Sequence, residues 1–304
     1  MSELDIKDYV YKKGAAMRIP VSGTFELTSR CNLSCKMCYV HMTPAEQDQV
    51  GRELSTEEWL RLGREAVDKG MIYLLLTGGE PFLRPDFVEL YTQLIKMGLL
   101  ITINTNATLL TPEILECFKK HRPEKVNVTL YGSSACTYGS LCGNSLGYEA
   151  AKWGILAMKE AGIRVALNTT FTRLNVRDME DIVAFAREHQ IPVRMSAYIF
   201  PPVRTIHETE DVNLSPEEMG RKSAYFDWIT LEEDKRMARA EMIRKALDSQ
   251  ITPETNQKSR ISACMAGRGA FWITWDGKMY PCGMLSDFSV NVHDRPFEEA
   301  WKDT

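Results

Sequence analysis

Residues 26–38 read ELTSRCNLSCKMC and carry Cys31, Cys35 and Cys38 within eight positions. This segment directly follows a strand-like run at residues 23–27, which predicts a loop at the end of the first strand of a sheet. Three thiolates on one tight loop can each bind one iron of a cubane and leave the fourth iron without a protein ligand. An iron left open in this way can bind and activate a small molecule, whereas a cluster closed by a fourth cysteine only carries electrons.

Two other interpretations of the triplet stay open. His41 would complete a Cys₃His zinc site in the spacing Cys31-x3-Cys35-x2-Cys38-x2-His41. Alternatively, Cys35 and Cys38 would form a redox Cys-x-x-Cys pair, which leaves Cys31 unexplained. The chain has eight cysteines in clusters and no secretory signal, so metal binding is favoured over a disulfide framework.

From about residue 20 to residue 200, strand-like runs alternate with amphipathic helical runs. The predicted strands are residues 23–27, 72–77, 100–105, 125–130, 164–170 and 192–197. Helix starts are also readable, because Ser55 and Glu58 form a capping box and Thr111 precedes Pro112 at a first helical position. Six βα units in a row predict a parallel sheet with right-handed crossovers, whose ligands lie at the carboxyl ends of the strands.

The predicted fold class is therefore α/β, a partial (β/α)6 parallel-stranded barrel with a small C-terminal hairpin-containing auxiliary domain. We expect the barrel in residues 1–202, a charged helical connector in residues 203–260 and a third region in residues 261–304. In the third region, FWITW and KMYPC are joined by Asp276-Gly277, a pair favoured in a two-residue type I′ turn, so a β-hairpin is predicted.

Composition restricts the classes of function. The chain has 37 Lys+Arg against 41 Asp+Glu, a formal net charge of −4, so no overall field draws it to nucleic acid or an anionic membrane. No apolar run approaches the roughly 18 residues that a bilayer span needs. The N-terminus lacks the apolar stretch of a secretory signal. We expect a cytoplasmic protein with no nucleic-acid or membrane partner.

Further motifs follow the later strands. Residues 77–81 read TGGEP, and polar residues end the next three predicted strands. Together with the C-x3-C-x2-C spacing, these motifs resemble the radical S-adenosylmethionine superfamily over roughly residues 20–200. The resemblance implies the following cofactor-binding residues: Thr77, Gly78, Gly79, Glu80, Asn104, Asn106, Thr129, Asn168 and Thr170.

Each of these residue types has a physical reason and a competing interpretation. Gly78 and Gly79 let the backbone approach a ligand with no Cβ in the way. Glu80 can accept a charge-assisted hydrogen bond from an ammonium group, or it is a solvated loop carboxylate. For the asparagines and threonines at the strand ends, the competing interpretations are turn chemistry and ordinary polar strand termini.

The same resemblance implies a mechanism. S-adenosylmethionine chelates the open iron of a [4Fe-4S] cluster, the reduced cluster cleaves it, and the resulting 5′-deoxyadenosyl radical takes a hydrogen atom from substrate. An electron donor such as ferredoxin or flavodoxin would reduce the cluster. We expect an oxidoreductase-like enzyme that modifies peptide or protein side chains. The alternatives are a radical enzyme acting on a haem precursor or another small molecule, and a non-catalytic iron–sulfur or zinc binding module.

Residues 264–283 resemble the opening of a SPASM domain, in which a hairpin carries ligands of an auxiliary iron–sulfur cluster. Gly277 and Cys282 fit its Gly-x4-Cys motif, and Cys264 precedes the hairpin. Four thiolates usually hold such a cluster, and residues 283–304 contain no cysteine. We expect Cys264 and Cys282 to reach one metal site that is empty or partly filled, with a disulfide as the competing outcome.

Two remaining features concern the substrate. About 20 residues precede the first predicted strand, too few for a separate leader-peptide recognition domain. We expect Cys136 and Cys142 in a loop on the presumed active face. There they would ligate an auxiliary cluster, meet the substrate or have no role.

Overall fold

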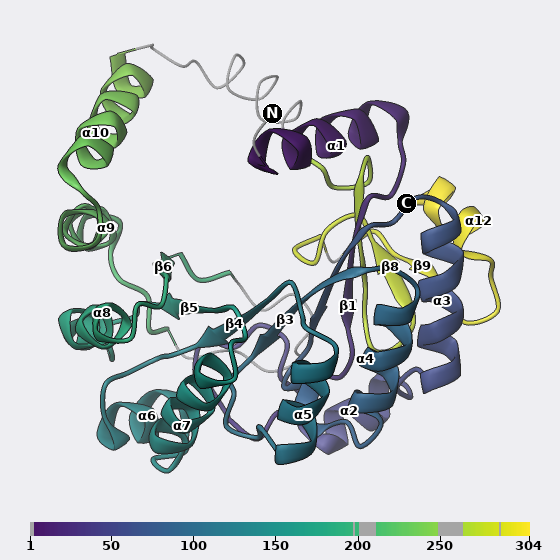
Figure 1. The fold of residues 1–304 in the computed structure, drawn as a ribbon, viewed down its shortest axis with the longest axis horizontal. Coiled ribbons are helices and arrows are strands. Elements are labelled where there is room, and N and C mark those ends of the chain that lie inside the picture. The colour runs from purple at the N-terminus through teal and green to yellow at the C-terminus, as the bar shows by residue number, and fades with distance from the viewer. Residues whose placement is uncertain (1–2, 197, 201–210, 249–263, 286) are drawn as a thin grey trace.

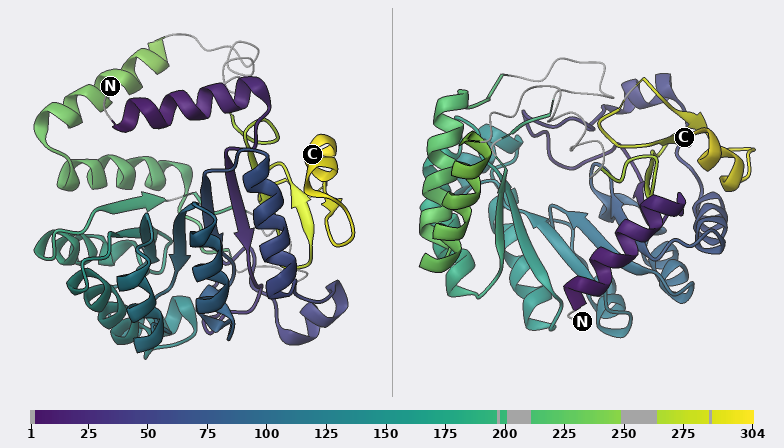
Figure 2. Two further views of the ribbon diagram at one scale, coloured as in Figure 1. Left: turned by 45° about the vertical axis from the view of Figure 1, so that its right-hand side comes forward. Right: turned by 90° about the horizontal axis from the view of Figure 1, so that it is seen from above.

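The computed structural model describes residues 3–196, 198–200, 211–248, 264–285 and 287–304. These residues form one curved sheet of nine strands in the order β6-β5-β4-β3-β2-β1-β7-β8-β9 (Figures 1 and 2). Six strands pair in parallel, each within one residue of its predicted bounds: β1 (Ser22–Glu26), β2 (Tyr73–Thr77), β3 (Leu100–Thr105), β4 (Lys125–Thr129), β5 (Val165–Thr170) and β6 (Val193–Ser196). The predicted α/β class and parallel barrel sheet are confirmed, and the sheet is not closed.

Helices between the parallel strands cover the outer, convex face of the sheet (Figure 2). The described helices are α1 (Glu3–Met17), α2 (Pro44–Val50), α3 (Thr56–Asp68), α4 (Phe87–Lys96), α5 (Pro112–Lys120), α6 (Ala135–Cys142), α7 (Gly147–Glu160), α8 (Met179–Glu188), α9 (Pro216–Thr230), α10 (Glu233–Asp248) and α12 (Phe297–Asp303). Two 3₁₀ turns join them, η1 (Pro81–Leu83) and η2 (Val176–Asp178). The predicted capping box of Ser55 and Glu58 opens α3, and Thr111 caps α5.

Side chains alternate between two environments along each parallel strand. In β4, Val126 and Val128 are fully buried on the convex face, under the helices. Lys125, Asn127 and Thr129 lie on the opposite, concave face and stay partly exposed. The same alternation recurs in β2 and β3. Because the helices cover only the convex side, the concave face is left partly exposed, with both polar and apolar side chains.

The C-terminal hairpin continues the barrel sheet. Its strands are β7 (Ala270–Ile273), β8 (Lys278–Tyr280) and β9 (Val290–Asn291), and β7 pairs in parallel with β1. The predicted two-residue type I′ turn is wrong. The Thr274 amide donates to the Lys278 carbonyl at 2.9 Å, which leaves a three-residue loop, and only Gly277 within that loop has a positive φ, 75°. A type I turn closed by a left-handed glycine fits this geometry, since type I′ needs positive φ at Asp276 as well.

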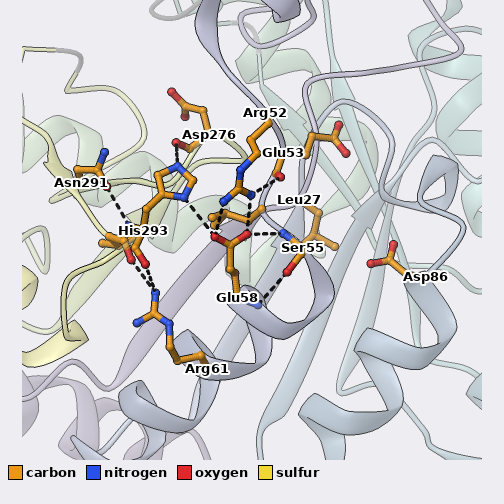
Figure 3. Close-up of polar contacts among 12 residues, drawn as sticks. Leu27, Arg52, Glu53, Ser55, Glu58, Arg61, Asp86, Asp276, Asn291 and His293 are labelled. Carbon is orange, nitrogen blue, oxygen red and sulfur yellow. Dashed lines mark hydrogen bonds and ion pairs between the residues drawn. The ribbon is translucent and has the colours of Figure 1, made fainter.

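His293 joins this C-terminal region to helix α3 (Figure 3). Its ring nitrogens lie 3.3 Å from Glu58 Oε1 and 3.1 Å from the Asp276 carbonyl oxygen. Glu58 also accepts a 2.7 Å hydrogen bond from Arg52, which is the main reason that its pKa falls to about 2. Glu58, whose carboxylate caps α3, therefore also links this helix to His293 in the C-terminal region of the chain.

The expected connector is helical where it is described, in α9 and α10. The rest of that prediction, residues 203–210 and 249–260, lies outside the described residues. The domain boundaries at residues 202 and 260 stay predictions. None of the helices in the described part of the chain is long and apolar enough to span a bilayer.

Gly154 sets the distance between α7 and the loop after β3, and this contact can be tested. A Cβ on Gly154 would lie 2.4 Å from the Ala107 carbonyl oxygen. We expect Gly154→Ala to lower the free energy of unfolding by about 1–3 kcal/mol, because the helix must move away from a backbone atom. Urea denaturation measures the change.

The matched control is Gly220→Ala in α9, where an added Cβ has no heavy atom within 4 Å. This helical glycine is exposed, so alanine should raise stability by up to about 1 kcal/mol. If both substitutions changed the free energy of unfolding in the same direction, the close packing at Gly154 would be contradicted.

Candidate functional site

The cysteine loop packs backbone against backbone on the loop that follows β2. The Gly79 amide donates to the Thr28 carbonyl at 2.7 Å, and the Glu80 amide donates to the Arg30 carbonyl at 2.8 Å. A Cβ on Gly78 would lie 2.5 Å from the Thr28 oxygen, and one on Gly79 would lie 2.2 Å from the Arg30 oxygen. The sequence analysis assigned these glycines to a close-lying ligand. The structure adds a second reason, which is the contact between the two loops.

The end of α6 supports the same cysteine loop. The Ser34 amide donates to the Cys142 carbonyl at 2.9 Å. The Cys142 side chain is fully buried and its thiol is hydrogen-bonded to the Cys35 thiol. The expected loop at Cys136 and Cys142 is wrong, because Ser134 caps a helix that contains both cysteines. Cys136, at the start of this helix, is exposed. Of the two cysteines whose roles the sequence left open, only Cys142 therefore touches the triplet.

A partly buried ion network anchors the start of the cysteine loop. Glu53 accepts hydrogen bonds from the Thr28 hydroxyl and from two nitrogens of Arg30, each of the latter at 2.9 Å. Arg84 is buried, lies 3.5 Å from Glu53 and donates to the Leu27 carbonyl at 3.1 Å. Burial opposes ionisation of Glu53, but the hydrogen bonds from Arg30 and Thr28 hold its pKa below the ordinary value. The carboxylate thus stays charged and keeps the loop in place.

A cavity of about 290 Å³ lies at the carboxyl ends of the parallel strands. Ten residues singled out from the sequence form part of its wall: Cys31, Cys35, Cys38, Thr77, Gly78, Gly79, Asn104, Asn106, Thr129 and Thr170. They come from five separate segments of the chain, which the parallel sheet brings to one edge. Their contacts with a cofactor stay a prediction.

The protein donors available in this cavity fit an iron–sulfur cluster. Three thiols that line one cavity suit a cubane, in which each thiolate binds its own iron. Burial raises the pKa of Cys31 to about 12 and that of Cys38 to about 11. Iron loading must therefore release protons from these thiols.

Glu80 lies beneath the cavity, and its carboxylate is fully buried. One oxygen accepts from the Thr105 hydroxyl at 2.7 Å and from the Phe82 amide at 3.0 Å, and the other accepts from the Asn106 amide at 2.7 Å. Burial raises the pKa of Glu80 to about 7. Three bonds within the protein therefore engage this carboxylate, and its contact with a ligand ammonium stays a prediction. The side chain points inward because Glu80 caps the turn η1.

Asn106 connects Glu80 to the first cysteine of the triplet, Cys31. Its side-chain nitrogen Nδ2 donates to Asn32 Oδ1 at 2.9 Å and lies 3.7 Å from Cys31 Sγ. Its side-chain oxygen accepts from the Thr108 amide at 2.9 Å. Asn106 thus shapes its own turn and also lines the cavity, so the turn role is shown and the contact with a cofactor stays a prediction.

Besides Glu80, three predicted site residues lie outside the cavity wall. Asn168 pairs with Thr129 in the sheet and lies next to β6. Cys264 is exposed and Cys282 is half-buried. A Cβ on Gly267 would lie 3.4 Å from Pro281, so the segments after Cys264 and before Cys282 meet at the open end of the hairpin. A metal site shared by the two cysteines, and with it the SPASM resemblance, stays a prediction.

Sequence reasoning missed an aromatic part of the cavity wall. Tyr39, Tyr198 and Phe200 line the cavity. The Phe200 ring centroid lies 6.4 Å from that of Tyr39 and 4.9 Å from that of Tyr198. Two of these residues closely follow β6. Applying the strand-end rule to the sixth strand, as to the first five, would have found them.

The comparisons with known proteins agree with this architecture. A model described as the Radical SAM superfamily matches residues 25–211. An AdoMet-dependent heme synthase of Methanosarcina barkeri is 28% identical over 291 residues, which are 91% of this chain and 81% of that protein. A PqqA peptide cyclase of Rhodopseudomonas palustris is 32% identical over 169 residues, 55% of this chain and 44% of that protein. The structure of Streptococcus suis SuiB bound to precursor peptide SuiA has the same fold, with a TM-score of 0.72 at 17% identity, over 99% of this chain and 69% of that chain.

Single replacement of Cys31, Cys35 or Cys38 by alanine should remove most of the iron at this site, because two thiolates hold a cubane poorly. Iron analysis and visible absorption of anaerobically reconstituted protein measure the loss. Cys142→Ala is the matched control, since it removes a buried thiol that touches Cys35 and should keep the wild-type iron content. Wild-type iron in the triple variant, or an equal loss in Cys142→Ala, would refute the assignment.

Glu80→Ala should lower the free energy of unfolding by about 1–3 kcal/mol or more, because buried donors lose their acceptor. Exposed Glu160 at the end of α7 gives the control, Glu160→Ala, with a change of about 0.5 kcal/mol or less.

The raised pKa of Glu80 also makes the free energy of unfolding depend on pH. The fold favours the neutral carboxyl, so this part of the stability is complete below about pH 4.5 and is lost as the pH rises through 7. The stability gap between wild type and Glu80→Ala should therefore narrow from pH 5 to pH 8, and a widening gap would be the contrary result.

Proposed function

The chain belongs to the radical SAM superfamily, and we propose that its substrate is a haem precursor, a tetrapyrrole that carries carboxylate side chains. The chain is thus an enzyme that uses a [4Fe-4S] cluster and S-adenosylmethionine. When bound, these cofactors supply a 5′-deoxyadenosyl radical that removes a hydrogen atom from the substrate. An external one-electron donor such as ferredoxin or flavodoxin completes the proposed system.

The residues of the cavity divide the work of cofactor binding. Cys31, Cys35 and Cys38 would hold three irons, which leaves one iron open. Residues 77–79 would present backbone groups to S-adenosylmethionine, because their glycines leave the peptide groups uncovered. The hydroxyl and amide groups at the ends of β3, β4 and β5 would then hydrogen-bond its polar parts. Glu80 would act indirectly, by holding the loops after β2 and β3 together.

The aromatic wall would exclude water from the reaction. Tyr39, Tyr198 and Phe200 stand along one side of the cavity. Apolar surface around a reactive intermediate prevents its loss to side reactions. This part of the site would therefore protect the radical while the substrate is positioned.

The extent of the similarity favours a haem precursor. The heme synthase relative aligns with 91% of this chain, whereas the peptide cyclase aligns with 55%. Cofactor handling is common to the superfamily, so similarity beyond the cofactor site carries more information about the substrate. Modification of a peptide side chain stays the second candidate, because the peptide cyclase has the higher identity over its shorter match.

Deuterium transfer tests the proposal. Reconstituted enzyme, S-adenosylmethionine and dithionite would be incubated anaerobically with a porphyrin deuterated in its propionate side chains. We expect the porphyrin to stimulate formation of 5′-deoxyadenosine, and this product to carry deuterium. Cys31→Ala should form none.

The same assay separates the substrate from the chemistry. Formation of 5′-deoxyadenosine without stimulation or deuterium transfer would refute the tetrapyrrole substrate and leave the radical chemistry intact. Stimulation by acidic or cysteine-containing peptides in place of the porphyrin would support the second candidate.

A further inference from the structure

The last turn of α6 runs along the cysteine loop. The Ser34 amide donates to the Cys142 carbonyl at 2.9 Å, and the Lys36 amide donates to the Leu141 carbonyl at 3.0 Å. Carbonyl groups in the last turn of a helix have no partner within the helix, so the loop satisfies two of them. Because the two amides belong to the residues on either side of Cys35, these bonds place Cys35 directly against the end of α6.

The Cys142 side chain is enclosed at this contact. It is fully buried, and its sulfur is hydrogen-bonded to that of Cys35. Gly143 follows with a left-handed φ of 70°, which ends the helix, and a Cβ at this glycine would lie 3.4 Å from the Ser34 side chain. The backbone at and directly after Cys142 is thus held against the loop, so the thiol has a fixed position beside Cys35.

The same helix is also tied to the wall of the cofactor cavity. Tyr138, one turn before Cys142, accepts a hydrogen bond from the Tyr131 amide at 3.4 Å, and Tyr131 lines the cavity. Tyr138 and Leu141 are buried in the apolar core. Helix α6 is therefore anchored both to the cysteine loop and to the chain that follows β4, which keeps Cys142 against the triplet.

Each sulfur of the triplet has a hydrogen-bond partner within the protein. Backbone amides two and three residues further along the chain donate to the sulfurs of Cys31 and Cys38, at 3.4 and 3.3 Å. Such backbone donors are supplied by almost any sequence. Cys35 differs, because besides its own amide it contacts a side chain from a distant segment, the thiol of Cys142. This contact depends on the identity of one residue and can be removed by substitution.

Iron binding decides which of the two sulfurs donates. A thiol that binds iron loses its proton, so Cys35 as a cluster ligand would accept the hydrogen bond and the Cys142 thiol would donate it. A hydrogen bond to a cluster sulfur stabilises negative charge, and the reduced cluster carries one electron more than the oxidised cluster. The bond is therefore stronger in the reduced state, which raises the reduction potential. Burial of Cys142 away from water strengthens this effect.

We propose that Cys142 is a positioning residue that acts through Cys35: its thiol donates a hydrogen bond to the Cys35 sulfur and thereby raises the reduction potential of the [4Fe-4S] cluster. The cluster then accepts one electron more readily from the external one-electron donor. This inference rests on the proposed ligation of the cluster by Cys31, Cys35 and Cys38, and it does not depend on the tetrapyrrole substrate.

A redox titration tests this inference without turnover. Anaerobically reconstituted protein, without S-adenosylmethionine or substrate, is titrated with dithionite in the presence of redox mediators, and the electron paramagnetic resonance signal of the reduced cluster is followed. Cys142→Ala should lower the midpoint potential by about 59 mV, which corresponds to a tenfold change in the one-electron equilibrium. The iron content of this variant should remain that of the wild type.

Two further variants serve as controls. Cys142→Ser keeps a hydroxyl donor at the same position, so its midpoint potential should stay at or above that of the wild type. Cys117→Ala removes another buried thiol, which lies in α5 at 3.4 Å from Thr92 Oγ1, and its midpoint potential should equal that of the wild type.

The outcomes separate this inference from the assignment of the triplet. If Cys142→Ala keeps both the iron and the potential of the wild type, the hydrogen bond is refuted and the triplet assignment stands. If Cys142→Ser or Cys117→Ala lowers the potential as far as Cys142→Ala, the effect comes from packing and the inference is wrong. If Cys142→Ala loses iron, Cys142 is a ligand and not a donor, which also overturns the inference. If the wild type forms no cluster, the proposed ligation by the triplet itself fails.

Discussion

Direct contact between two loop backbones is the constraint on which the site depends. Adjacent strands β1 and β2 end in register, with Glu26 opposite Thr77, so the loops that follow them leave the sheet side by side. Two amide–carbonyl bonds of 2.7 and 2.8 Å then join residues 28–30 to residues 79–80. No Cβ fits between these loops, so Gly78 and Gly79 are needed before any ligand binds. The cysteine loop therefore packs directly on the backbone of residues 78–80, with no side chain between them.

Glu80 extends this constraint to the third strand. Burying a carboxylate costs solvation free energy, which its raised pKa reflects, and three hydrogen bonds offset part of that cost. The result is a rigid link between the ends of β2 and β3, continued by Asn106 to Cys31. A site held in this way is organised in advance for its cofactors, which catalysis by precise positioning requires.

The two faces of the sheet explain how one fold serves stability and binding. Helices bury the valines and leucines of the convex face, where nearly all of the core around the parallel strands lies. The concave side chains of β2, β3 and β4 stay partly exposed and include tyrosine and leucine as well as threonine, asparagine and lysine. Stability therefore depends mainly on the convex residues, and the concave residues remain accessible to a ligand.

Local patterns were enough to predict the six parallel strands, the helix caps and the cysteine triplet, because each depends on residues that are neighbours in the sequence. Most predicted cavity residues also follow from that pattern, since parallel strands share a carboxyl edge. The inward direction of Glu80 and the contact of Cys142 with Cys35 had no such signal. Each joins segments that are distant in the chain, and only strand register and the packing of loops and helices decide which of them meet.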